Sequence, residues 1–407
     1  MNNLLEDLYI AYMEARKNKR GSINQLRFEL EFEHGLHTLC EEISERTYEP
    51  SPSTAFIVKS PVQREIFAAD FRDRIVHHLI YRYIISIVER KLINDTYSCR
   101  KGKGTLYGIN RMKGFMHGIT DNYHREAWVL KIDISGYFMN MNRKLLFESL
   151  MNIINDDIIK WPDQKRETLM FLLQKNIFND PSKNCIIKGR KSDWQGLPKN
   201  KSLFHSLPGC GLPIGNLTSQ LYGNIYLNGF DHYVKRILKI RYYGRYVDDM
   251  VLLHADKHYL MLCLEDIVKK LEKEFLLQVH PKKIYLQPCS KGFPFLGRFI
   301  KPWRSYCGKR TKQNFYRCIT QLNKKWNTMH WPSDELINET ISSINSYLGI
   351  IRHSDSFRLR KNMLKKVNPC MWKYLSADKE LHKISIHEHI KDIMLLNRTD
   401  FHTTSGY

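Results

Sequence analysis

Two adjacent aspartates, Asp248 and Asp249, lie between two largely apolar runs of this sequence. Arg241–Val247 precedes them and Met250–Leu253 follows. This pattern predicts a β-hairpin whose turn displays both carboxylates at one edge of a sheet. Adjacent carboxylates repel each other unless a cation neutralises them. An Asp-Asp turn is common by itself, because aspartate favours turns, so the pair indicates chemistry only together with a further acid.

Asp133 is that further acid, because it ends the mostly apolar run Trp128–Asp133. Aspartate is disfavoured in strands, so its place there calls for a reason. If the two strands pair, Asp133 and Asp248 meet and form a cluster of oxygen ligands that suits Mg²⁺. Two divalent ions at such a cluster stabilise the attacking and leaving oxygens of a phosphoryl displacement. The three acids therefore predict nucleotidyl transfer.

The charge of the chain agrees with a polyanionic partner. Its 407 residues include 64 Lys+Arg and 42 Asp+Glu, for a formal net charge of +22. This surplus favours nucleic acid first and an anionic membrane surface second. The hydrophobic share of 43% excludes wholesale disorder. The basic region beyond Lys301 is interleaved with aromatics such as Trp303 and Tyr306, so we expect it to contact phosphates; a merely solvated face is the alternative.

Other classes of protein are disfavoured by what the sequence lacks. No run of about 18 apolar residues predicts a membrane span, and the start does not resemble a secretory signal. The 9 cysteines are scattered without a C-x-x-C pair, which predicts free thiols and no zinc site. We therefore expect a cytoplasmic chain with no membrane partner.

Several elements must position these acids, and periodicity and turn residues predict them. Helices are expected at the N-terminus, over about 23–45, around 75–87 and around 264–275. A basic turn with two glycines is expected at 98–105, and 179–210 is expected to form loops that could include a hairpin. In chain order, the predicted strands are 55–58, 64–69, 128–133 and 242–253, and from 301 onward the chain is expected to be helical, with Ser333 and Asp355 as N-caps.

The motifs occur in an order that resembles the reverse transcriptases. Tyr246–Asp249 matches the signature hairpin of that family, and Lys131–Asp133 matches its first catalytic strand. The upstream segment Phe71–Arg74 and the downstream segments Val279–Lys283 and Phe295–Gly297 resemble its fingers, leaving-group and primer-grip blocks. The resemblance covers about residues 55–300.

The resemblance also implies roles for individual residues. Asp133, Asp248, Asp249 and Lys283 would be catalytic, with Lys282 as the alternative to Lys283 and with Asp249 supporting the site. Asp133, the backbone carbonyl of Ile134 and Asp248 would bind two Mg²⁺ ions, for which Mn²⁺ is a substitute. Arg64, Arg72, Arg74, Phe138, Ile214, Gly215 and Gln220 would contact the incoming dNTP, and Arg100, Lys101, Lys103, Phe295, Leu296 and Gly297 would contact template or primer.

For Phe138 and for the basic turn, a structural role is the alternative to a contact with the substrate. Phe138 falls where the family keeps an aromatic that clashes with a 2′-OH and so excludes ribonucleotides; core packing is the other interpretation. For the basic turn at Arg100, Lys101 and Lys103, a plain turn is the alternative to a template contact.

One block departs from most of the family. Leu212–Gln220 carries Ile214 where most relatives have the glutamine of Pro-Gln-Gly. Together with segments 98–105 and 66–74, this form is similar to the reverse transcriptases of diversity-generating retroelements. That likeness implies copying of a template RNA into cDNA with errors at adenines, mutagenic retrohoming and a basic accessory variability protein. A glutamine could hydrogen-bond near the nascent pair, whereas Ile214 can only pack, so we expect lower fidelity.

The predicted fold is α+β, a right-hand polymerase with fingers, a palm containing an antiparallel sheet, and a helical thumb. Its predicted parts are an N-terminal helical extension (1–50), fingers (51–128), first palm strand (129–149), an insert (150–205), palm (206–300), thumb (301–375) and C-terminal tail (376–407). The expected partners are template RNA, cDNA or primer, and dNTPs, in a bacterial or phage-encoded system. A retron, group II intron maturase or abortive-infection enzyme, and a catalytically degenerate RNA-binding scaffold, are the alternatives.

Overall fold

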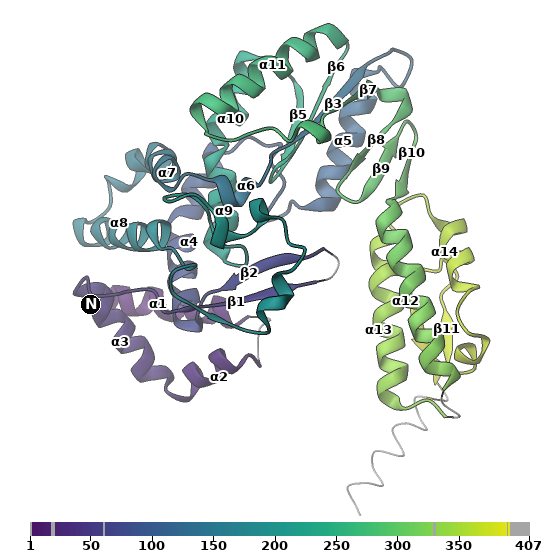
Figure 1. Cartoon of the computed structure of the whole chain (residues 1–407), viewed down its shortest axis with the longest axis horizontal. Helices are drawn as coiled ribbons and strands as arrows, with labels where there is room; N and C mark the ends of the chain where they lie inside the picture. Colours follow the sequence, from purple (N-terminus) through teal and green to yellow (C-terminus); the bar gives the residue numbers. More distant parts are fainter. Residues whose placement is uncertain (1, 18–20, 60–61, 329–330, 389, 391–407) are drawn as a thin grey trace, which may run out of the picture. The chain divides into compact units, whose positions relative to one another are not determined.

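A computed structural model describes residues 2–17, 21–59, 62–328, 331–388 and 390 of the chain (Figure 1). The chain divides into two compact units. The first unit consists of Met1–Gly108 and Trp128–Gln287, and the second of Ile109–Ala127 and Pro288–Tyr407. The second unit therefore takes in residues 109–127, which the sequence assigned to the fingers, and starts again before the predicted thumb.

The first unit begins with helices that pack on one long buried helix. These are α1 (Asn2–Arg16), α2 (Ile23–Leu30), α3 (Phe32–Ser44) and α4 (Phe71–Lys91), of which α4 is capped by Asp70 through the Arg72 backbone N–H. The single helix predicted over 23–45 is two helices, because Glu31 leaves helical geometry at φ −121° and ψ 36°. The predicted basic end of the first helix falls partly on residues 18–20, outside the described residues.

A three-stranded sheet follows, with strand order β2-β1-β4. Its strands are β1 (Ser53–Val58), β2 (Arg64–Ala68) and β4 (Cys185–Ile187), with β4 parallel to β1. The hairpin considered for 179–210 is wrong. The buried Glu65 carboxylate instead accepts hydrogen bonds from Trp194 Nε1 at 2.7 Å, Ser202 Oγ at 2.8 Å and the Leu203 backbone at 2.5 Å. Because this segment folds around one acid, it forms short turns: η1 (Lys191–Trp194), η2 (Lys199–Lys201) and η3 (Leu203–His205).

The second sheet of this unit has the order β5-β6-β3-β7. Its strands are β3 (Trp128–Asp133), β5 (Tyr242–Tyr246), β6 (Asp249–His254) and β7 (Tyr285–Pro288). The hairpin predicted within 242–253 is therefore present, with Val247 and Asp248 in its turn and Asp249 as the first residue of β6. The helices around the sheet are α6 (Tyr137–Asn140), α7 (Arg143–Ile158), α8 (Asp163–Phe178), α9 (Leu217–Tyr226), α10 (Asn228–His232), the π-helix η4 (Tyr233–Ile237) and α11 (Lys257–Glu274).

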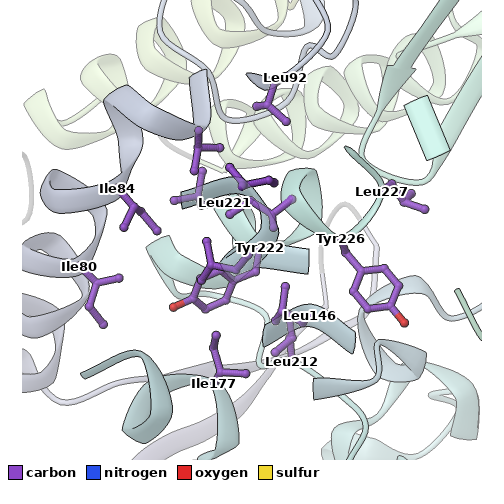
Figure 2. Packing of buried hydrophobic residues seen from close by; sticks show 14 of the residues in the cluster. Ile80, Ile84, Leu92, Leu146, Ile177, Leu212, Leu221, Tyr222, Tyr226 and Leu227 are labelled. Carbon is purple, nitrogen blue, oxygen red and sulfur yellow. The ribbon is translucent and has the colours of Figure 1, made fainter. Parts of the chain in front are cut away.

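A shared hydrophobic core joins these helices to the sheet. Figure 2 shows Ile80 and Ile84 of α4 near Leu221 and Tyr222 of α9, with Ile177 of α8 beside them, and all five side chains are buried. The α9 helix is buried along most of its length, so the four-stranded sheet and the N-terminal helices belong to one packed body. Burial of apolar surface of this extent is the main force that holds the sheet in place.

The second unit combines one helix from the middle of the chain with everything after residue 287. In chain order its elements are α5 (Thr105–Ile119, which starts in the first unit), η6 (Cys289–Lys291), β8 (Phe293–Phe295), β9 (Arg298–Lys301), β10 (Arg304–Cys307), α12 (Lys309–Asn327), α13 (Asp334–Ile351), α14 (Phe357–Leu364), η7 (Pro369–Lys373), β11 (Leu375–Ala377) and β12 (Ile384–Ile386).

Three details of this unit differ from the sequence-based expectations. The chain beyond 301 is not uniformly helical, since β10 pairs with β9 and β11 with β12. Ser333 caps α13 as predicted, but α14 is preceded by Ser356, and Asp355 instead accepts the Ser305 backbone N–H at 2.8 Å. The predicted tail from 376 starts inside β11, and Ile384 of β12 is buried in the core of the helical bundle. The rest of that tail, at 389 and 391–407, lies outside the described residues.

Candidate active site

Strand pairing brings the three candidate carboxylates to one edge of the four-stranded sheet. β3 and β6 run antiparallel with Asp133 directly opposite Asp249. β5 and β6 form the hairpin, with Tyr246 opposite Asp249, so Asp248 lies in the two-residue turn next to this pair. The expected pairing of the two strands is therefore present, and it joins acids that are distant in the sequence.

The carboxylates are partly desolvated and repel one another. Burial, followed by the charge of Asp133, raises the pKa of Asp248 to about 6. Burial also raises the pKa of Asp249 to about 6, and Lys131 acts in the opposite direction. In the described part of the chain, the buried Asp249 Oδ1 has no hydrogen-bond partner. A nearby cation would stabilise the charged form of these carboxylates.

Two lysines supply positive charge to this edge. Lys283 Nζ lies 2.7 Å from Asp133 Oδ1, and Lys131 Nζ lies 3.1 Å from Asp249 Oδ2. Lys283, rather than the alternative Lys282, makes the contact with the catalytic strand. Sequence reasoning assigned no role to Lys131. Its spacing carried a signal, because residues two apart in a strand face the same side, and Lys131 and Asp133 are two apart.

A buried arginine beneath the hairpin was also missed. Arg245 and Asp231 are both 0% exposed, and their side chains pair through Nε–Oδ1 at 2.8 Å and Nη2–Oδ2 at 2.5 Å. Arg245 Nη1 also donates to the Val247 carbonyl at 3.0 Å. Val247 has φ 58°, which is unusual for a β-branched residue. The guanidinium therefore holds the strained turn that carries Asp248.

The three arginines expected at the incoming nucleotide lie in different surroundings. Arg64 is exposed at the start of β2, and its charge lowers the pKa of Asp248, so it lies near the carboxylates. Arg72 Nη1 instead donates to Glu42 at 3.0 Å, and its guanidinium lies over the Tyr48 ring. Arg74 Nε donates to the Ala69 carbonyl at 3.0 Å. These contacts give Arg72 and Arg74 partners within the protein, and their role at the triphosphate stays a prediction.

Phe138 and Ile214 meet in a small apolar cluster. Ile214 and Phe138 both pack against the buried cluster that includes Phe67 and Met139, and the Ile214 carbonyl accepts the Phe67 backbone N–H at 3.0 Å. The Phe138 ring lies against Gly223, where an added Cβ would be 3.3 Å from it. Packing, the alternative for Phe138, thus accounts for part of its surroundings.

The neighbours of Ile214 in the same block hold its loop in place. Gly215 has φ 124°, and an added Cβ there would lie 2.9 Å from Ile66 Cγ2, so the position requires glycine. Gln220 Oε1 accepts a hydrogen bond from Cys99 Sγ at 3.1 Å, which links it to the basic turn.

The basic turn uses its arginine internally. Arg100 is 9% exposed, and its guanidinium bonds to Glu89, the Ile93 carbonyl and Thr96. Lys103 Nζ donates to the Asn94 carbonyl at 2.5 Å, whereas Lys101 is exposed. These contacts favour the plain-turn alternative for Arg100, and a template contact by this turn stays a prediction.

The candidate primer-grip turn lies in the second unit. Phe295 is buried, and Leu296 and Gly297 form the two-residue turn between β8 and β9 with φ 46° and 78°. Positive φ at both positions is the type I′ hairpin geometry, which the glycine makes accessible. The Gly308 backbone N–H donates to the Gly297 carbonyl at 2.9 Å and braces this turn.

The donors at the carboxylate edge fit a hard divalent cation. The described residues contain no three His, Cys, Asp or Glu side chains already arranged to hold a metal ion. The chemistry of the donors is nevertheless that of Mg²⁺ ligands, since Asp133 and Asp248 supply carboxylate oxygens and Asp249 has an orphaned buried oxygen. The Ile134 carbonyl stays a predicted third ligand.

A comparison with known families identifies the group to which the chain belongs. The sequence profile described as "Reverse transcriptase (RNA-dependent DNA polymerase)" matches residues 64–300, which include all three acids, Lys283 and the primer-grip turn. The chain is a member of the reverse transcriptase family. It has the right-hand polymerase fold, with the carboxylates on its palm sheet.

Two curated relatives of this family member are similar to it at low identity. "Nuclear intron maturase 4, mitochondrial" from Arabidopsis thaliana is 23% identical over 236 residues, 57% of this chain and 24% of that protein. "Protein YkfC" from Escherichia coli K12 is 25% identical over 308 residues, 67% of this chain and 73% of that protein. The chain thus spans about a quarter of the maturase.

Solved telomerase structures are also similar. An apo telomerase from Candida tropicalis, truncated from its C-terminal domain, has a TM-score of 0.45 at 13% identity, covering 63% of this chain and 54% of that chain. Telomerase from Candida albicans with a fragment of telomeric RNA has a TM-score of 0.47 at 10% identity, covering 86% of this chain and 60% of that chain. Among the helices described for this reverse transcriptase, none is long and apolar enough to cross a membrane.

Proposed function

We propose that this chain is an RNA-directed DNA polymerase that extends a primer along a template RNA by adding dNTPs. The observation that carries the proposal is the convergence of Asp133, Asp248 and Asp249 through the β3–β6 register, with Lys283 at 2.7 Å from Asp133. In the proposed reaction, the primer 3′-OH attacks the α-phosphate of the dNTP and pyrophosphate leaves. The positive charge of the chain suits its polyanionic substrates.

The roles of the acids and lysines follow from their contacts. Asp133, Asp248 and the Ile134 carbonyl would hold Mg²⁺ or Mn²⁺, which would stabilise the charge on the attacking and leaving oxygens when bound. Lys283 reaches the same edge as Asp133 and is placed to give a proton from Nζ to the departing pyrophosphate. Asp249 is held by Lys131 and supports the arrangement.

Two further residues would bind and select the incoming nucleotide. Arg64 is exposed and lies close enough to Asp248 to lower its pKa, so its guanidinium suits the triphosphate oxygens. Phe138 follows the catalytic strand and lies against Gly223, which limits how far its ring can withdraw from a 2′-OH. We include Phe138 as the group that excludes ribonucleotides.

Primer extension on a defined RNA template tests the proposal. Asp248→Asn keeps the size of the side chain but removes a metal-binding charge, so the rate should fall by roughly a thousandfold or more. Asp266→Asn, an exposed residue on α11, is the matched control and should extend normally. An Asp248→Asn protein that extends the primer at the unaltered rate, in the absence of contaminating enzyme, would overturn the assignment and favour an RNA-binding scaffold.

We also propose that the enzyme is error-prone at template adenines and serves mutagenic retrohoming in a diversity-generating retroelement, with a basic accessory variability protein. The support is Ile214, which packs against the same apolar cluster as Phe138 and has no side-chain group that could hydrogen-bond to the nascent base pair. Ile214→Gln should lower misincorporation at adenine by roughly tenfold, since one positioning bond is worth about 1–3 kcal/mol. Ile214→Val keeps an apolar side chain and should leave the error rate unchanged. Equal error rates in Ile214→Gln and the unaltered enzyme would refute this part.

A further inference from the structure

An exposed tryptophan occupies the tip of the β9–β10 hairpin in the second unit. Lys301 and Arg304 close this hairpin, so Pro302 and Trp303 are its two turn residues. Trp303 is 72% exposed although it is the largest apolar side chain of the hairpin. A solvent-exposed indole gains little from burial, so core packing does not account for its position.

The backbone at Trp303 is strained. Its φ is 66°, and the Arg304 backbone N–H donates to the Pro302 carbonyl at 2.8 Å, which is the hydrogen bond of a strained γ-turn centred on Trp303. A bulky residue at positive φ costs conformational free energy that glycine would not. Such strain at an exposed position is a reason to look for a function of the side chain.

A second strained aromatic meets the first from a distant part of the same unit. Tyr123 lies in the loop between α5 and β3 and follows Asp121 and Asn122; all three have positive φ, at 70°, 47° and 56° respectively. The ring centroids of Tyr123 and Trp303 are 4.4 Å apart at an interplanar angle of 57°, and the ring centroid of His117 lies 5.6 Å from that of Tyr123. Two strained turns therefore build one aromatic platform, the rings of Trp303, Tyr123 and His117, with Trp303 outermost.

The charge around the platform favours an anionic ligand with a flat group. Lys301 and Arg304 flank Trp303 and are both exposed, and no ion pair engages either in the described part of the chain. In the loop that carries Tyr123, Asp121 forms an ion pair with Arg125 at 3.5 Å. Glu126 is the other acidic residue of that loop. Proteins bind single-stranded nucleic acids by stacking the bases on aromatic rings and by placing cationic side chains next to the phosphates.

We propose that the Trp303 platform binds single-stranded nucleic acid by stacking a base on the indole while Lys301 and Arg304 contact the adjacent phosphates. The platform shares no residue with the three carboxylates, and within the second unit the candidate primer-grip turn is at the opposite end of β9 from Trp303. The inference rests on the nucleic-acid-binding part of the proposed function. It concerns affinity for an unpaired strand and involves no chemical step.

Binding of a labelled single-stranded RNA to the full chain, without metal or dNTPs, tests the platform. Trp303→Gly should weaken binding by roughly 5- to 100-fold, the worth of one stacked base. Glycine suits the positive φ, so the midpoint of thermal unfolding should not fall. Trp303→Phe keeps an aromatic face and should keep most of the affinity, and Trp331→Ala, which removes an equally accessible indole (82% exposed), should leave affinity unchanged.

A ligand without bases separates stacking from charge. Inorganic polyphosphate should bind the unaltered chain and the Trp303→Gly chain equally well, whereas Lys301→Gln with Arg304→Gln should weaken both polyphosphate and RNA and reduce the salt dependence. If Trp303→Gly destabilises the fold and leaves RNA affinity unchanged, the indole only braces the two loops and the proposal fails. It also fails if RNA affinity is unchanged while binding of an accessory protein is lost, because the platform then serves a protein partner. Since the assay contains no dNTPs, its outcome is independent of whether primer extension occurs.

Discussion

Two hairpins of this chain share an unusual backbone but differ in what surrounds it. Both the β5–β6 and β9–β10 hairpins have two-residue turns. In each turn a bulky residue has positive φ, 58° at Val247 and 66° at Trp303. Val247 is packed against the core and its carbonyl is held by the fully buried Arg245, whereas Trp303 projects into solvent.

The difference indicates that the same backbone strain can have two roles: it can fix a neighbouring residue, or it can expose a side chain to solvent. At Val247 the surrounding contacts hold the turn in one conformation, so that the neighbouring Asp248 is fixed beside the pair of Asp133 and Asp249. At Trp303 few contacts hold the strained backbone, so this turn exposes the indole to solvent and does not fix a neighbouring residue. The two hairpins should therefore respond differently to substitution.

Removing the guanidinium should have the largest effect. Arg245→Met leaves Asp231 buried and unpaired, so the free energy of unfolding should fall by about 3–5 kcal/mol. Urea unfolding followed by circular dichroism measures this. No substitution of a side chain in the β9–β10 turn should approach that loss.

A combined variant separates the stability of this network from its effect on the turn. Arg245→Met with Asp231→Leu and Tyr243→Phe removes the whole buried polar group, since Tyr243 OH donates to Asp231 at 2.6 Å. Stability should largely return, because apolar replacement of a buried pair is often neutral. Primer extension should stay roughly tenfold slower, because Val247 has lost its hydrogen bond. Unaltered extension by this variant would mean that Arg245 does not position the hairpin.

The second prediction concerns pH, to which only the β5–β6 hairpin should respond. The pKa of Asp248 is raised to about 6 by burial and by Asp133, above the value near 4 expected in the unfolded chain. The folded state therefore binds the proton more tightly, so this group favours folding below pH ~4, and that contribution is lost as the pH rises through about 6.

Without metal, Asp248→Asn should accordingly raise the free energy of unfolding by roughly 1–3 kcal/mol at neutral pH. The gain should disappear below pH ~4, where Asp248 becomes protonated in both states. Unfolding in a chelating buffer across this range measures it, with Trp303→Gly as the variant whose effect should not change with pH. A gain that is constant with pH would contradict the charge-based explanation.

The smallest effects should come from glycine substitutions in the two turns. Val247→Gly relieves strain but loses apolar contacts, so stability should change by no more than about 1 kcal/mol, while primer extension slows because the turn is looser. Trp303→Gly should leave stability unchanged or raise it by up to about 1 kcal/mol, with normal extension on a short primer–template. Equal behaviour of the two variants would remove the distinction between the hairpins.

The sequence predicted the parts of the site that are encoded locally. Apolar runs ending in Asp133 and flanking Asp248–Asp249 indicated two strands with acids at their ends, and pairing of these strands needed only their hydrophobic pattern. Ser333 as the cap of α13 was likewise readable, because capping depends on residues within one turn of a helix.

Other features of the structure depend on partners far away in the sequence, which local patterns do not reveal. Arg72 and Arg100 looked like phosphate ligands, but Glu42 and Glu89 engage them, and such pairings depend on how helices pack. The 179–210 segment lacks a hairpin because it folds around Glu65, more than a hundred residues earlier. A buried acid imposes turns that no local propensity specifies.

The sequence by itself therefore determined the family's chemistry: three acids, a lysine and a large positive charge in the right order along the chain. Only the tertiary structure decided which cations are available to substrates, that Lys131 and Arg245 hold the acidic edge, and that residues 109–127 join the second unit and bring Tyr123 to Trp303. The physical reason is that residue types and periodicity fix local conformation, whereas the pairing of buried charges and rings depends on which distant surfaces pack together.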